Sequence, residues 1–378
     1  MGASEFRRLF RETTFHPVNG GGVVYHRKAR RLFALNDAAA FVWLGLRDGK
    51  VPAALIVDLR ETFGVDGTVA ELWVGQAISD FKVIGDVAVS PSPEWPHQDK
   101  AEVGARGVDY QLLGQTLRID AGVSTLKSID SLLGGMRRQN SGTPDIAVEI
   151  TDEVDTCQVH FHQNVFGIAT RDRIVPEMER FVYEEMVPRV RHFLAFHAAL
   201  MQCGDIGVLF AAPSGSGKST LSAVLSSRGW RYRSDEMALL DRELGWRGVP
   251  LPPCIKSDNY SRIEKWHPSL RDVSEHIRYG RKVKYLPVQA EGNAADVTIV
   301  VFPRLSEAEA AGLTAIDPLA ALTQLLSLCV YVPLGFTESD VTRLLQWHER
   351  TRYFELAVAD PSEAAVALED LCMNARGW

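Results

Sequence analysis

Gly207-Val-Leu-Phe-Ala-Ala-Pro-Ser-Gly-Ser-Gly-Lys-Ser-Thr220 is the stretch of sequence that decides the fold of the second half of the chain. It runs from an apolar segment through a glycine-containing turn into residues with helical spacing, which predicts a buried strand, a loop and a helix that begins near Lys218. In such a loop, backbone N–H groups and the positive end of the helix surround a polyphosphate. Lys218 then reaches the outer phosphate oxygens, and the Ser219 hydroxyl ligates Mg²⁺. The pattern therefore predicts a site for a nucleotide, which we expect to be ATP with Mg²⁺.

This loop departs from the strict phosphate-loop pattern at one position. The pattern places glycine where Ala212 stands, whereas Gly215 and Gly217 remain. A purely structural turn of glycine and serine is the alternative, but the apolar lead-in and the helical spacing that follows favour nucleotide binding. The residues that we expect to contact the nucleotide are Pro213, Ser214, Gly215, Ser216, Gly217, Lys218, Ser219 and Thr220.

Composition narrows the classes of function. The chain has 378 residues, of which 46% are hydrophobic and 24% charged, as in globular proteins of two or three domains. A formal net charge of −7 and short basic runs give no support to a nucleic-acid partner. No apolar segment is long enough to cross a bilayer and the first residues lack the apolar region of a signal peptide, so we expect no membrane association and a cytoplasmic location. Five cysteines without a C-x-x-C pair predict reduced thiols.

The N-terminal region has the pattern of a small binding domain over residues 1–88. The predicted elements are strands at residues 15–18, 23–25 and 31–35, and helices at residues 37–47, from Pro52 onward, and from a capping box at Thr68-Val-Ala-Glu71. This order predicts a winged-helix-like domain whose small size suits binding rather than chemistry. Pro- and Ser-rich sequence then predicts a linker at residues 89–107, which leaves residues 108–378 for a second domain.

Residues 15–87 resemble the PqqD family of leader-peptide recognition elements. The resemblance depends on Leu32-Phe-Ala-Leu-Asn36, on Ala40-Phe-Val-Trp43 and on the order of the helices. In that family, the leader of a ribosomally made, modified peptide pairs with an exposed strand edge beside the third helix. An unpaired strand offers N–H and C=O groups for such pairing, and side-chain pockets add specificity. The resemblance implies a precursor peptide as partner; a small domain that only packs on its neighbour is the alternative.

The second domain has the pattern of an α/β fold around the phosphate loop. Its predicted elements are strands at residues 110–119, 146–150, 156–166, 206–210 and 297–302, and a long helical run at residues 177–201.

An acidic pair, Asp235-Glu236, interrupts a further predicted strand at residues 232–240, shortly after the phosphate loop. A path of loop, helix, turn and strand brings these carboxylates back beside the phosphates. There one can hold Mg²⁺ and the other can accept a proton from an attacking hydroxyl. Adjacent side chains on an extended strand point to opposite faces, so the pair needs a bend or a division of roles.

This combination resembles the HPr kinase/phosphorylase family, which shares a phosphate-loop fold with phosphoenolpyruvate carboxykinase. The matching stretches are Pro213-Ser-Gly-Ser-Gly-Lys-Ser219, Arg228-Gly229, Ser234-Asp-Glu236 and the histidine of Phe196-His-Ala-Ala. The resemblance implies that Asp235 is the general base toward a peptide hydroxyl. It also implies that Glu236 assists the metal or the proton path, that His197 lies close to the phosphates, and that Ser219, Asp235 and Glu236 surround Mg²⁺.

Two departures from that family affect the expected activity. Glu236 replaces an aspartate, and the arginine-glycine signature after the acidic pair is only echoed by Trp246-Arg-Gly-Val249. Because the signature is associated with phosphorolysis, we expect a kinase without efficient dephosphorylating activity. Assembly into a homo-oligomer is implied by the resemblance alone.

Several other residues carry weaker expectations. Lys256 and Lys284 can close over the phosphates as cationic clamps, although a solvated surface lysine is nearly as good an interpretation for each. Arg304 follows a predicted strand, and a structural ion pair explains it equally well. His160 and His162 alternate along a predicted strand without a third ligand, so we expect ordinary strand residues rather than a metal site.

Together the two regions predict an ATP-dependent kinase that phosphorylates a hydroxyl, most simply of serine, on a precursor peptide captured through its leader. Capture by the first domain would raise the effective concentration of the acceptor at the second. Two alternatives stay open. One is a kinase of a free small molecule such as an amino acid or sugar, and the other is a non-catalytic, ATP-dependent switch that carries a peptide.

Overall fold

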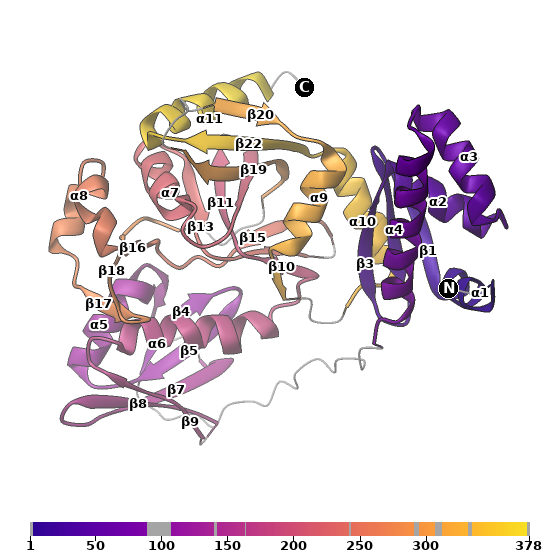
Figure 1. Cartoon of the computed structure of the whole chain (residues 1–378). Helices are drawn as coiled ribbons and strands as arrows, with labels where there is room; N and C mark the ends of the chain where they lie inside the picture. Colours follow the sequence, from indigo (N-terminus) through magenta and orange to yellow (C-terminus); the bar gives the residue numbers. More distant parts are fainter. Residues whose placement is uncertain are drawn as a thin grey trace. The chain divides into compact units, whose positions relative to one another are not determined.

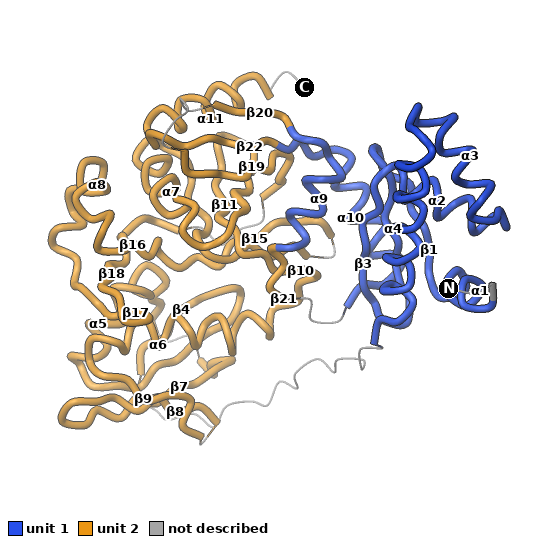
Figure 2. The backbone as a smooth tube through the Cα atoms, in the orientation of Figure 1, with its two compact units in different colours: residues 1–94, 316–327, 334–353 blue, residues 95–315, 328–333, 354–378 orange. Residues whose placement is uncertain are grey.

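The computed structural model describes residues 3–88, 107–139, 142–162, 164–241, 243–290, 295–306, 312–331 and 335–375. The chain divides into two compact units, shown in different colours in Figure 2. Unit 1 holds residues 1–94, 316–327 and 334–353, and unit 2 holds residues 95–315, 328–333 and 354–378. Helices and strands alternate along the chain, and two of the sheets combine parallel with antiparallel pairs, so the protein has the predicted α/β class. Apart from Gly107, the predicted linker lies outside the described residues.

Unit 1 is built on an antiparallel sheet of three strands in the order β1-β2-β3. The three predicted strands are confirmed, whereas the helix that precedes them was not predicted. The elements of unit 1 are α1 (Ala3–Glu12), β1 (Thr13–Val18), β2 (Gly21–His26), β3 (Arg31–Asn36), α2 (Asp37–Arg47), α3 (Pro52–Phe63), α4 (Gly67–Gly85), α9 (Pro318–Ser327) and α10 (Glu338–Glu349).

Polar caps and turn residues set the limits of the three central helices. Asn36 caps α2, because its side chain accepts a hydrogen bond from the Ala39 N–H at 2.9 Å. The helix α3 begins at the predicted Pro52. The predicted capping box at Thr68 is wrong. Asp66 caps α4 instead, accepting from the Val69 N–H at 2.9 Å, so the helix begins before the threonine.

One face of the sheet and the helices α1 to α4 share a single apolar core. Trp43 lies at its centre with 1% of its surface exposed. Its ring makes edge contacts with Phe10 of α1 at 5.1 Å and with Phe81 of α4 at 4.9 Å between ring centroids. The sheet contributes Val24 and Leu35 to the same core. Burial of this apolar surface is what holds the small unit together.

The opposite face of the sheet is covered by residues from late in the chain. Val23 and Tyr25 flank Val24 on β2, point to the other face and are buried. The Tyr25 hydroxyl donates to the Phe336 carbonyl, and the Phe336 N–H donates to the Arg30 carbonyl at 3.2 Å. Contacts of this kind add α9 and α10 to the unit that we expected to end at residue 88.

The described residues of unit 2 form four sheets. Six strands form the sheet β6-β4-β5-β7-β8-β9, and six others form β13-β11-β12-β19-β22-β20. Smaller sheets have the orders β15-β14-β10-β21 and β16-β18-β17. The first six-stranded sheet packs with α5 and α6 around one core, and the second packs with α7 and α11 around another (Figure 1).

The elements of the first part of unit 2 are β4 (Val108–Leu112), β5 (Gln115–Asp120), α5 (Val123–Leu133), β6 (Arg137–Arg138), β7 (Ile146–Asp152), β8 (Thr156–Phe161), β9 (Asn164–Thr170), α6 (Ile174–Phe181), β10 (Leu194–Phe196), β11 (Ala198–Cys203), β12 (Ile206–Ala211) and α7 (Lys218–Ser227). Those of the second part are β13 (Arg231–Ser234), β14 (Ala238–Leu240), β15 (Trp246–Gly248), β16 (Cys254–Lys256), α8 (Tyr260–Ile263), β17 (His276–Arg278), β18 (Arg281–Tyr285), β19 (Val297–Leu305), β20 (Gly312–Ala315), β21 (Cys329–Tyr331), β22 (Arg352–Val358) and α11 (Pro361–Ala375).

The predicted helix at residues 177–201 is wrong in its second half. Helix α6 continues through irregular turns to Arg189, and Pro188 stands at this end. Residues 194–196 and 198–203 then form β10 and β11. Apart from Gln202, these strands are apolar because they are buried within sheets, and such a run carries no period that separates a strand from a helix.

Two predicted single strands are hairpins. Residues 110–119 turn at Leu113, with φ of 56°, and at Gly114, with φ of 78°. Residues 156–166 turn at His162, whose φ is 48°. His162 therefore lies in a turn, not on a strand face shared with His160, and the expected alternation of the two histidines is wrong.

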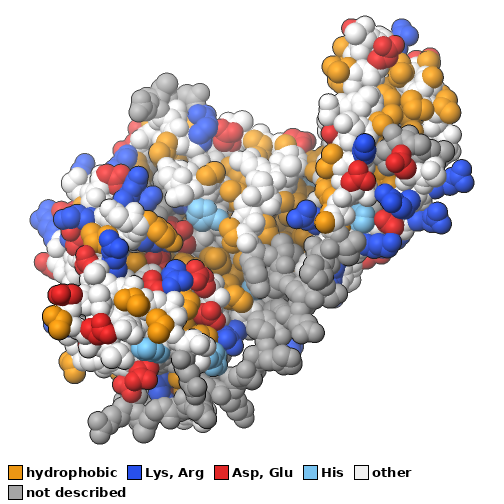
Figure 3. All heavy atoms as spheres, turned by 60° about the horizontal axis from the view of Figure 1, so that its bottom comes forward, with side chains coloured by type: hydrophobic (Ala, Val, Ile, Leu, Met, Phe, Trp, Pro, Cys, Tyr) orange, Lys and Arg blue, Asp and Glu red, His pale blue; other side chains and the backbone are white. Residues whose placement is uncertain are grey.

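Charged side chains of both signs lie on the molecular surface. Basic and acidic side chains are interspersed on the face that Figure 3 shows. Among the helices of the described ranges, none is both long and apolar enough to cross a membrane.

Candidate active site

The phosphate loop lies between β12 and α7 in unit 2. Strand β12 sits inside the sheet, pairing with β11 on one side and β19 on the other, so it holds the start of the loop firmly. Gly215 and Gly217 have φ of 89° and 90°, a left-handed conformation that explains why glycine stands at both positions. Ala212 has no such conformation and is buried, so alanine fits where the strict pattern has glycine.

The amine of Lys218 is buried at the base of this loop. It donates to the Ala212 carbonyl at 2.6 Å and to the Pro213 carbonyl at 3.1 Å. Burial lowers the pKa of Lys218, and the nearby charges of Asp235 and Glu236 oppose that shift. These contacts hold a cation within the loop, where the phosphate oxygens of a nucleotide would lie.

The acidic pair lies at a bend between two short strands. Strand β13 ends at Ser234 and β14 begins at Ala238, and the two belong to different sheets. The bend lets the neighbouring side chains of Asp235 and Glu236 both line one pocket, which an extended strand would not allow. The required bend is therefore present.

Asp235 is a buried carboxylate with one free oxygen. Its Oδ1 accepts a hydrogen bond from the Ser222 hydroxyl at 3.2 Å, whereas its Oδ2 is buried without a hydrogen-bond partner. Burial, with help from the charge of Glu236, raises the pKa of Asp235 to about 6, against the lowering effect of Ser219 and Lys218. A buried oxygen without a partner is rare, and it marks a group kept ready for a cation or a proton.

Glu236, by contrast, has both carboxylate oxygens engaged. Oε2 lies 3.2 Å from His197 Nε2, and Oε1 accepts from Arg278 Nη1 at 2.9 Å. Burial alone would raise the pKa of Glu236, but the contacts with His197 and Arg278 outweigh it and lower the pKa to about 2. Glu236 is thus a fixed anion, while Asp235 holds the free oxygen.

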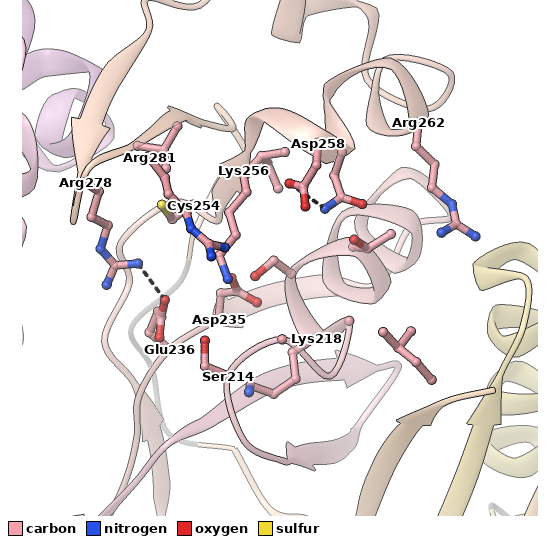
Figure 4. Close-up of a pocket in the computed structure, with 18 of the residues that line it drawn as sticks. Ser214, Lys218, Asp235, Glu236, Cys254, Lys256, Asp258, Arg262, Arg278 and Arg281 are labelled. Atoms are coloured by element: carbon pink, nitrogen blue, oxygen red, sulfur yellow. Dashed lines mark hydrogen bonds and ion pairs between the residues drawn. The ribbon is translucent and has the colours of Figure 1, made fainter. Parts of the chain in front are cut away.

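These residues line one pocket of about 770 Å³ (Figure 4). Figure 4 shows Lys218 and Ser214 beneath it and Asp235 and Glu236 along one wall. The predicted site residues on its lining are His197, Ser214, Gly215, Gly217, Lys218, Ser219, Thr220, Asp235, Glu236 and Lys256. Pro213 and Ser216 belong to the same loop but are not part of the lining.

Two weaker candidates lie elsewhere. The Lys284 amine donates to the Leu270 carbonyl at 2.8 Å and to the Arg271 carbonyl at 3.1 Å, and it does not line the pocket. Arg304 makes the structural ion pair that we weighed as its alternative, with Glu355 at 2.7 Å. In this structure the Lys284 amine caps carbonyl groups of a neighbouring turn, and its role as a clamp stays a prediction.

Several other residues that line the pocket were not predicted from the sequence. They come mainly from the turn between β17 and β18 and from the segment after β16, and they include Arg278, Tyr279, Arg281, Asp258 and Arg262. The residues from Arg278 onward read as a solvated basic run. Among these residues, Tyr279 has a left-handed backbone conformation with φ of 51°, which is unusual for a tyrosine.

The donor set fits Mg²⁺ bound together with a nucleotide. Mg²⁺ takes one or two protein oxygens and fills its remaining positions with phosphate and water. The free Oδ2 of Asp235 and the Ser219 hydroxyl beside it supply such oxygens. In the part of the chain that the structure describes, no group of three or more His, Cys, Asp or Glu side chains could hold a metal alone.

No family model and no curated protein matches this sequence. Among solved structures, the chain is similar to the Hpr(Ser) kinase/phosphatase from Coxiella burnetii, at 14% sequence identity. That match covers 48% of this chain and 93% of the other, with a TM-score of 0.25. Similarity at this level does not establish a shared function, so function follows from the site.

Proposed function

We propose that this protein is an ATP-dependent phosphotransferase that moves the γ-phosphoryl group of ATP to a hydroxyl of a peptide. One observation carries the proposal. The free, buried oxygen of Asp235 lies in the same pocket as the phosphate loop with Lys218. A loop that only bound nucleotide would not need a second carboxylate held this way, whereas transfer to a hydroxyl needs a proton acceptor.

Each of these residues has a separate role in phosphoryl transfer. Lys218 and the loop N–H groups bind the phosphates and stabilise the charge that spreads over the transferring oxygens. Ser219 would hold Mg²⁺, which neutralises phosphate charge when bound, so the free oxygen of Asp235 stays available for the proton. The acceptor oxygen forms its bond to the γ-phosphorus as the bond from that phosphorus to the β–γ bridging oxygen breaks. The hydroxyl proton passes to Asp235, and ADP leaves.

A raised pKa suits Asp235 to this role. A base works best when its pKa lies near the working pH, and burial raises the pKa of Asp235 to about 6. The fixed anion Glu236 raises it further and, through its own contacts, keeps His197 beside the pocket.

The peptide acceptor is the second part of the proposal, and unit 1 supports it. Strand β3 stands at an edge of the sheet order β1-β2-β3, and Ala34 in its middle is exposed. Such an edge offers backbone groups for an added strand of peptide. A leader bound there would raise the local concentration of the acceptor segment.

The experiment is intact-mass spectrometry of serine-containing precursor-length peptides with ATP and Mg²⁺. Deleting residues 1–88 is a poor probe, because it would uncover Leu319 and other apolar residues of α9 and α10 that unit 1 buries. The substitution Ala34→Pro instead blocks the β3 edge. Val57→Ser, at an exposed position of α3, is its matched control.

We expect a phosphate-sized mass gain with wild type and the Val57→Ser variant. The gain should be lost with Asp235→Asn, and slowed with Ala34→Pro at an unchanged melting temperature. Phosphoryl transfer to amino acids or sugars, at a rate that Ala34→Pro leaves unchanged, would point to a small-molecule kinase. ATP hydrolysis without any phosphorylated product would instead support the switch.

A further inference from the structure

A continuous chain of charged contacts lies behind Glu236. Arg278 donates from Nη1 to Glu236 at 2.9 Å, and its Nε lies 3.0 Å from Oε2 of Glu179. The Tyr285 hydroxyl donates to the same Glu179 oxygen at 2.7 Å. On the pocket side, Glu236 contacts His197. The order Glu179, Arg278, Glu236, His197 therefore runs from the protein core to the pocket.

Each member of this chain comes from a different element. Glu179 lies on α6, Arg278 ends β17, Glu236 lies in the bend after β13, and His197 separates β10 from β11. Glu179 is only 2% exposed. Burying a carboxylate is costly, and a buried ion pair adds little stability over apolar residues, so stability alone does not account for the arrangement.

We infer that Arg278 is a positioning residue for the phosphotransfer reaction, an inference that rests on the proposed function. Its planar guanidinium presents two N–H groups to two carboxylates, which fixes orientation in a way that a lysine cannot. Glu179 holds the guanidinium from the core side. Arg278 in turn holds one carboxylate oxygen of Glu236, and the other oxygen of Glu236 holds His197.

The arrangement also assigns the proton on His197. An ionised carboxylate only accepts hydrogen bonds, so the His197 Nε2 that faces Glu236 carries the proton. The histidine is thereby oriented at the pocket, which it lines. Nearby, the Arg278 guanidinium lies 5.4 Å from the centre of the Tyr279 ring.

A purely structural role for Arg278 makes different predictions. As a structural tie between α6 and β17, its loss would lower the melting temperature and weaken nucleotide binding and turnover together. As a positioning residue, its loss lowers kcat while leaving nucleotide affinity intact. Small misplacements of groups at a reacting centre cost on the order of 100-fold in rate.

The test uses the full chain and four variants. Arg278→Met removes the guanidinium, and Arg278→Lys keeps the charge without the planar fork. Because Arg278→Met leaves Glu179 without its cation, the double variant Glu179→Gln/Arg278→Met removes both charges and should fold. Lys282→Met is the matched control, because Lys282 lies on β18, outside the pocket lining, in an exposed ion pair with Glu275.

We expect kcat to fall about 100-fold in Arg278→Met and in the double variant, with the Kd for MgATP within about threefold of wild type. The Arg278→Lys variant should recover little of the lost kcat, and the kcat of Lys282→Met should stay within about twofold of wild type. A double variant with the kcat of wild type would overturn the inference. Loss of MgATP affinity in proportion to kcat would also overturn it, in favour of the structural tie.

A measurement without turnover separates this inference from the proposed function. The Nε2 proton of His197 should give an NMR resonance shifted by its hydrogen bond to Glu236, and that shift should disappear in Arg278→Met. An unchanged resonance would refute positioning. A wild-type protein that transfers no phosphoryl group but shows the NMR change would refute the proposed function and leave the contact chain supported.

Discussion

Replacing Asp235 with asparagine should make the folded protein more stable while abolishing transfer. In the native structure, burial raises the pKa of Asp235 from 3.8 to about 6. The folded state therefore disfavours the ionised carboxylate by about 3 kcal/mol at neutral pH. An amide at this position removes the charge and keeps the acceptor for the Ser222 hydroxyl. Its NH₂ group, however, replaces an oxygen that has no partner, which costs about 1–2 kcal/mol.

The net gain in the free energy of unfolding should be about 1–2 kcal/mol at pH 7.5, or roughly 3–6 °C in melting temperature. The raised pKa of Asp235 means that the fold favours the protonated form. The free energy of unfolding of wild type therefore falls as the pH rises from about 4 through 6. Asp235→Asn has no such loss, and its advantage should vanish at pH 5.

Thermal and urea unfolding of both proteins at pH 5 and pH 7.5 would measure this difference. The result that refutes the reasoning is an Asp235→Asn protein that is less stable than wild type at pH 7.5, or one whose advantage is the same at both pH values.

Three further predictions concern the loop, a helix cap and the core. Lys218→Met should abolish MgATP binding in calorimetry while the far-UV circular dichroism spectrum stays that of wild type; bound nucleotide would contradict the assigned loop. Asp66→Ala should lower the free energy of unfolding in urea by about 1 kcal/mol, whereas Thr68→Ala should leave it nearly unchanged. A larger loss for Thr68→Ala than for Asp66→Ala would instead support the predicted capping box. Trp43→Ala should cost about 3–5 kcal/mol in the unfolding of unit 1, and a loss below 1 kcal/mol would show that its core is loosely packed.

The parts of the site that depend on local sequence could be predicted. The phosphate loop is a strand, a turn and a helix in succession, and its glycines stand where the backbone is left-handed. The acidic pair follows within one further helix and strand, so the chain path limits where Asp235 can lie. The three strands and the helices at Asp37 and Pro52 were predictable for the same reason.

The rest depends on contacts between residues far apart in the chain. Arg278 and Glu179 find each other through tertiary packing, and neither has a local pattern that indicates it. Strands β10 and β11 are apolar on both faces, so their sequence carries no strand period. The cover of the β1-β2-β3 sheet by α9 and α10 likewise has no signal near either segment.

The discontinuity of unit 1 in the chain has a consequence for synthesis. Residues 316–353 follow α4 by about 230 residues, so at ~5–20 residues per second the ribosome needs on the order of 10–50 s to supply them. Throughout that interval Val23 and Tyr25 lack their native cover. Unit 1 is thus completed only after most of unit 2 has been synthesised, and chaperones that bind exposed apolar surface have a defined window in which to act on it.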